Sequence, residues 1–86
     1  MKMIVCSVKD IVGDAFGRPY CVQCEGSGIR SFSDEVNRSA DDNLLYKHPE
    51  DFALYRVGTF DDSDGIVVAE QHKLLVLARD MVIKVQ

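Results

Sequence analysis

HPEDFALYRVGTFDDSDG, residues 48–65, is the stretch that decides the fold. Pro49 stands where a short helical turn would begin, and the carboxylates of Glu50 and Asp51 follow it, as the positive end of such a turn prefers. Residues 54–60 are rich in aromatic and β-branched side chains and predict a strand. The acidic run that ends at Gly65 predicts a hairpin turn, because glycine adopts positive φ readily. The stretch indicates a small α+β domain and contains no catalytic pattern.

Further strands are predicted on both sides of this stretch. Met3 to Val8 is β-branched, and Tyr20 to Gln23 predicts a short second strand. Ile66 to Glu70 returns across the acidic turn as the hairpin partner of residues 54–60. Alternation along that first hairpin strand assigns Leu54, Arg56 and Phe60 to one face and Tyr55, Val57 and Thr59 to the other.

One main helix is predicted over residues 28–38, after the glycines at 26 and 28. Ile29, Phe32 and Val36 recur at helical spacing and predict a stripe that faces the core. Ser27 is the expected N-cap. On another face, Arg30, Asp34 and Arg38 repeat every fourth residue and predict ion pairs.

The tail, residues 72–85, admits two interpretations. Leu74 to Ala78 fits strand or helix, whereas Met81 to Val85 favours strand. Two short strands split at Arg79 and Asp80 would form a second hairpin, and one C-terminal helix is the alternative. The fold expected is an antiparallel sheet of four or five strands with one main helix packed on a face, in a single domain of residues 1–86. Since so small a sheet has edges that the apolar tail could cover by pairing with a second copy, we expect a homodimer.

Composition excludes several classes of protein. The apolar fraction of 47% is too high for a disordered chain, and no apolar run is long enough for a membrane span. The first apolar stretch ends too early, at Lys9 and Asp10, for a signal peptide. The net charge is −4, with four basic and ten acidic groups in residues 25–65. This balance counts against a nonspecific DNA coat, which depends on Lys and Arg neutralising phosphates.

Metal, redox and catalytic patterns are weak. Cys21 and Cys24 have a metal-like spacing, but Cys6, His48 and His72 are the only other candidate zinc ligands. We therefore expect buried or incidental thiols, no metal and no cofactor. No spacing ties either histidine to a nucleophile, so we do not expect an enzyme.

Cations and aromatic rings alternate through much of the chain, which is the mixture that single-stranded nucleic acid requires. Rings stack on bases, and cations follow the phosphates. Arg18, Tyr20, Arg30, Tyr55 and Arg56 are the members expected to be exposed and close together. An ordinary solvated surface is the alternative interpretation.

Three stretches of the chain resemble one family, the small nonstructural protein of gokushoviruses, which are microviruses with circular single-stranded DNA. VCSVKD (residues 5–10) followed by AFGRPY (15–20) is similar to the family's opening strand and aromatic residue beside proline. IRSFSDEVN (29–37) resembles its helix, and HPEDFALYRVGTFDD (48–62) is the most specific match. The resemblance covers roughly residues 3–68, the tail from Gln71 on matches poorly, and the three cysteines are not part of the family's pattern.

The resemblance implies a nonstructural protein made in the host bacterial cytoplasm and absent from the mature virion. It implies a regulator of viral single-stranded DNA replication or packaging that binds nucleic acid. The residues expected to hold phosphate are Arg18, Arg30, Arg38, Lys47 and Arg56, with Tyr20 and Tyr55 stacking on bases. The alternative is a non-enzymatic protein-interaction module that acts on the phage replication initiator, on capsid assembly or on a host factor.

Overall fold

The protein is described here by a computed structural model that covers residues 1–83. The strands are β1 (Lys2–Asp10), β2 (Ala15–Phe16), β3 (Tyr20–Val22), β4 (Phe52–Asp61) and β5 (Ile66–Leu77). The helices are α1 (Glu25–Val36), α2 (Leu44–Lys47) and two 3-10 turns, η1 (Pro49–Asp51) and η2 (Ala78–Met81). Within this range no helix has both the length and the apolar character that crossing a membrane requires.

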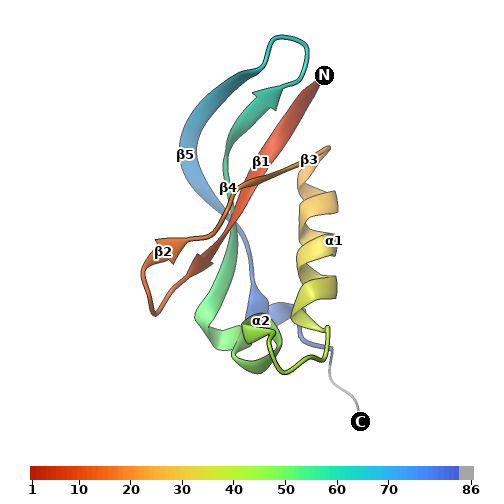
Figure 1. The fold of residues 1–86 in the computed structure, drawn as a ribbon, viewed down its shortest axis with the longest axis vertical. Coiled ribbons are helices and arrows are strands. Elements are labelled where there is room, and N and C mark those ends of the chain that lie inside the picture. Colours follow the sequence, from red (N-terminus) through yellow and green to blue (C-terminus); the bar gives the residue numbers. More distant parts are fainter. Residues whose placement is uncertain (84–86) are drawn as a thin grey trace.

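The five strands form one antiparallel sheet in the order β2-β1-β4-β5, and β3 joins the same edge of β1 as β2. Figure 1 shows α1 running along one side of this sheet and the β4–β5 hairpin extending past the end of the helix. The predicted fold, α+β with one main helix on a sheet, is therefore confirmed.

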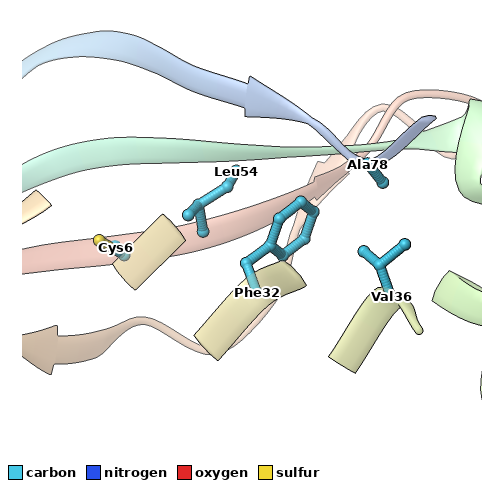
Figure 2. Close-up of a cluster of buried hydrophobic side chains, with 5 residues drawn as sticks. All are labelled: Cys6, Phe32, Val36, Leu54 and Ala78. Carbon is cyan, nitrogen blue, oxygen red and sulfur yellow. The ribbon is translucent and has the colours of Figure 1, made fainter. Parts of the chain in front are cut away.

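The core lies between α1 and the covered face of the sheet (Figure 2). Phe32 of α1 points toward Leu54, Val36 points toward Ala78, and Cys6 of β1 lies at the other end of the cluster. Phe32, Val36, Leu54 and Cys6 are almost fully buried. The predicted stripe on the helix is confirmed, since Ile29 packs against the same cluster. Ala78 of η2 belongs to the same buried cluster.

The helix begins earlier than its sequence predicts. Its N-cap is Cys24, in extended conformation, and not Ser27, which lies inside the first turn. Glycine normally disfavours a helix interior, and this is why residues 26–28 predict a break before the helix. At Gly28, however, an added Cβ would lie 3.2 Å from the sulfur of Cys6. The glycine allows close approach of helix and sheet, and this packing outweighs its poor propensity.

The hairpin at residues 61–65 has the predicted turn chemistry. The side chain of Asp61 accepts a hydrogen bond from the backbone of Ser63, and that of Asp64 accepts one from Ile66. Gly65 has a φ of 75°. The turn before β4 is also confirmed, with Pro49 at the start of η1.

A bulge in β4 overturns part of the predicted alternation. Cys6 pairs with Arg56 but Val5 pairs with Gly58, so Val57 is an extra residue in the ladder. Beyond it the faces exchange. Phe60 pairs with Met3 and shares the face of Tyr55, whereas Thr59 pairs with Ile4 on the helix side.

The tail differs from both sequence interpretations. β5 is one strand of 12 residues, and the chain then turns through η2, so residues 72–83 contain no hairpin and no long C-terminal helix. The side chain of Asn37 bonds to the backbone of Met81 and Ile83, which fixes this segment against the end of α1. Of the strand predicted over residues 81–85, residues 81–83 are not a strand, and 84–85 lie outside the described residues.

Candidate nucleic-acid interface

Three rings from three strands meet on the sheet face that α1 leaves uncovered. The ring centroids of Phe16 (β2) and Tyr55 (β4) are 5.5 Å apart, and those of Phe16 and His72 (β5) are 4.9 Å apart. Tyr55 and His72 are 6.5 Å apart, and all three contacts are edge to face. We call these side chains the ring cluster. Because β2 and β5 stand at opposite ends of the strand order, this contact requires the sheet to curl toward the uncovered face.

The register of β1 positions two of the rings and a cation. Tyr55 pairs with Ser7, and Phe16 pairs with Lys9, so both rings lie on the same face of the sheet. The Nζ of Lys9 is 5.5 Å from the ring centroid of Phe16 and 3.4 Å from Oδ1 of Asp14. A cation beside an aromatic ring is the combination that single-stranded DNA binds, since bases stack and phosphates are neutralised.

A groove runs along the same face, beside the ring cluster. It consists of two hollows of about 240 and 210 Å³ that share Pro19 in their walls. The first is lined by Ser7, Phe16, Gly17, Pro19, Val57 and His72, and the second by Val5, Pro19, Cys21, Phe60 and Val67. We call the two together the sheet groove. Its walls are mostly apolar, and Phe16 is 39% exposed, so a planar base has both a surface to stack on and access to it.

Two of the predicted residues lie at this face. Tyr55 belongs to the ring cluster. Arg18 is exposed and stands between Gly17 and Pro19, both of which line the groove. The structure thus places one predicted ring in the ring cluster, and one predicted cation is exposed next in sequence to two residues that line the groove.

Tyr20, by contrast, lies on the helix side of the sheet. It pairs with Cys6 and packs against the core. Burial raises the pKa of its hydroxyl. A ring in this position supports the core and has little surface for a base.

The three predicted cations on the helical segments are away from the sheet groove. Arg38 is bound to Glu35, with Nη2 2.7 Å from Oε1, and this replaces the predicted pairing with Asp34. Lys47 donates from Nζ to the backbone oxygen of Asp41 at 3.0 Å. Arg30 is exposed on α1, which packs on the opposite face.

Arg56 is held in a cluster of charges on the helix side. Its Nε and Nη2 donate to both carboxylate oxygens of Glu70, at 2.8 and 3.2 Å, and its Nη1 donates to Glu25 at 3.0 Å. Lys73 donates to the same Glu25 at 3.1 Å. Two carboxylates around one guanidinium repel phosphate, so this position of Arg56 is unfavourable for binding DNA. The contacts instead link the start of α1 to β4 and β5.

The charge cluster predicts a pH dependence of stability. Lys73 and then Arg56 lower the pKa of Glu25 below its ordinary 4.5, and Arg56 does the same for Glu70. A lowered folded-state pKa stabilises the fold fully above the unfolded value, and this stabilisation is lost as the pH falls through the folded value. Arg56→Gln should therefore flatten the curve of Tm against pH between about pH 5 and pH 3, whereas Arg30→Gln should leave its slope unchanged. Parallel curves for both variants and the native chain would contradict the assignment.

Sequence reasoning missed Lys9 and His72 and did not assign Phe16 to the site. Phe16 was visible as an aromatic residue beside Arg18 and Pro19. His72 gave no local signal, because two irregularities in the β4–β5 register determine where it lies.

Groups that could ligate a metal are sparse over residues 1–83. His48, Glu50 and Asp51 offer three ligand atoms within 4.8 Å of one another, on the largely exposed turn before β4. No cysteine belongs to a cluster of this kind within that range. Cys6 is buried, and Cys24 is exposed at the N-cap of α1, where a hydrogen bond with the hydroxyl of Ser27 lowers its pKa.

Comparison with known protein families places the chain beside phage proteins. Residues 3–81 match the model of a family described as Phage ORF5 protein, so the match covers most of the chain and includes β5 and η2. No curated protein and no solved structure matches the chain.

Proposed function

Since the chain belongs to the Phage ORF5 protein family, we propose that it is a non-enzymatic bacteriophage protein that binds single-stranded viral DNA and regulates its replication or packaging. The resemblance of residues 48–62 to the small nonstructural protein of gokushoviruses supports the finer assignment to those phages. The same resemblance implies that the protein acts in the host bacterial cytoplasm and is absent from the mature virion.

The observation that supports DNA binding is the ring cluster with Lys9 beside it and Arg18 at the rim of the sheet groove. Stacking contributes about 1–3 kcal/mol per base, so two accessible rings outweigh a small number of phosphate contacts. The acidic groups of α1 lie on the opposite side of the sheet, where they repel the strand least. The net charge of −4 is therefore compatible with binding that rests on stacking.

Titration into labelled single-stranded and duplex DNA, followed by fluorescence anisotropy at several salt concentrations, tests the proposal. We expect binding to the single strand only, because the rings reach bases that a duplex keeps stacked. If Lys9 and Arg18 each neutralise one phosphate, log K should fall with log salt at a slope of about −1.4. Equal affinity for duplex, a much steeper slope, or no binding at low salt would each refute it.

A protein-interaction module is the second candidate, favoured by the exposed apolar residues of β5 and the acidic middle of the chain. Its partner would be the phage replication initiator, a capsid assembly protein or a host factor. A complex that withstands high salt, recovered from infected cells by a chain with no DNA affinity, would favour this candidate.

A further inference from the structure

Strand β5 is an edge strand of the sheet within residues 1–83. It pairs with β4 on one side only, so the outward backbone groups have no strand partner within this range. Ile66, Val67, Val68 and Leu74 are between 47% and 67% exposed. A long apolar edge strand is a template for pairing with another chain, and natural proteins normally shorten, charge or cover it.

The sequence of β5 is complementary to itself when reversed. IVVAEQHKLLVL has four apolar residues at each end, and its midpoint falls between Gln71 and His72. Antiparallel pairing about this midpoint places Glu70 opposite Lys73 twice, with apolar residues opposite apolar ones on both sides. Opposite charges that face each other across strands stabilise pairing, whereas like charges oppose it.

We propose that β5 pairs antiparallel with β5 of a second copy about this midpoint, which makes a two-fold dimer with one continuous sheet. A two-fold axis is the symmetry that makes one strand meet itself. A slip of one residue would place Glu70 opposite His72 or Leu74, so only this register pairs the two charges.

The faces of the central residues agree with this register. Ala69 pairs with Gly58 and Leu74 with Tyr55, so both lie on the groove side, and they would face each other across the dimer. Glu70 and Lys73 both belong to the charge cluster on the helix side. Lys73 is 61% exposed and Glu70 34%, so both can extend to a second chain while keeping their own partners. One irregularity of β5 lies between Ala69 and Lys73, at the midpoint itself, and it is the reason that Glu70 and Lys73, three residues apart, share a face. The bulge at Leu75 interrupts the alternation further out.

The dimer would bring two sheet grooves onto one side of a single sheet, because paired strands share their faces. This consequence rests on the proposed function, since it gives one DNA strand two ring clusters to follow. Dimer formation itself does not depend on DNA. It is measured without DNA, so a negative result for the dimer does not refute DNA binding, and a negative result for DNA binding does not refute the dimer.

Sedimentation equilibrium of the full chain tests the pairing. We expect a species of twice the 9.6 kDa chain mass at high concentration. Lys73→Glu and Glu70→Lys should each weaken the dimer about tenfold, because each places like charges opposite one another twice, and the double variant should recover most of the loss. Arg79→Glu is the matched control, since it makes the same charge change just beyond the strand and should leave the dimer intact.

A monomer at every concentration, or a dimer that withstands both single substitutions, overturns the proposal. Circular dichroism establishes whether each variant is folded. If a variant is not, hydrogen exchange of the native chain decides, because concentrating it should protect the amides of residues 66–77. Unchanged exchange in β5 would also overturn the pairing.

Discussion

Alanine in place of both Phe16 and Tyr55 is expected to weaken single-stranded DNA binding by about 2–6 kcal/mol, because each ring that stacks on a base contributes about 1–3 kcal/mol. In dissociation constants this is a loss of about 30-fold to 10⁴-fold. The rings contact each other at 5.5 Å, so the double variant removes the stacking platform while Lys9 and Arg18 remain. Anisotropy titration of the same labelled strand gives the measurement.

The matched control is Tyr46→Ala. Tyr46 is 46% exposed on α2, away from the sheet groove, and its removal deletes an accessible ring without touching the ring cluster. An equal loss of affinity in this variant, or full affinity in the double variant, would show that DNA is bound elsewhere. The salt slope should stay unchanged in the double variant, because no cation is lost.

Sequence alone could locate part of this platform. Tyr55 was identifiable because it stands in a strand with strong local signals, between a proline turn and a glycine turn. Phe16 and His72 were not identifiable as its neighbours, since the curl of the sheet brings them together and the curl depends on long-range pairing. The same limit explains Arg56, whose carboxylate partners come from α1 and β5.

The features of the fold also separate into those set by local sequence and those set by long-range contacts. The hairpin at Gly65 and the helix stripe at Phe32 follow from local chemistry and periodicity, and both were predicted correctly. The bulge at Val57 and the early start of α1 both depend on Cys6 of β1. Cys6 pairs with Arg56 beside the bulge, and its sulfur lies close to Gly28 of α1. Residues that are distant in sequence determine these features, and periodicity within one segment carries no information about them.

The contact of β4 with β5 gives the second large expected effect, at Gly58. A Cβ at this position would clash with the backbone oxygen of Val68, since real Cβ atoms are essentially never found so close to another atom. The obstacle is backbone, so no side-chain rotation relieves it, and the two strands must separate. Gly58→Ala should therefore destabilise the protein by about 1–3 kcal/mol, as other overpacked sites do.

Gly26→Ala is the control with the opposite expected sign. Gly26 lies in the first turn of α1, and the nearest atom to an added Cβ, the sulfur of Cys24, is 4.0 Å away. Alanine there should stabilise the protein by about 0.5–1 kcal/mol, because it restricts the unfolded chain. Each kcal/mol corresponds to about 4–8 °C in Tm for a domain of this size, so thermal unfolding separates the two variants clearly. Should Gly58→Ala match the native Tm, β4 and β5 do not approach closely at this point.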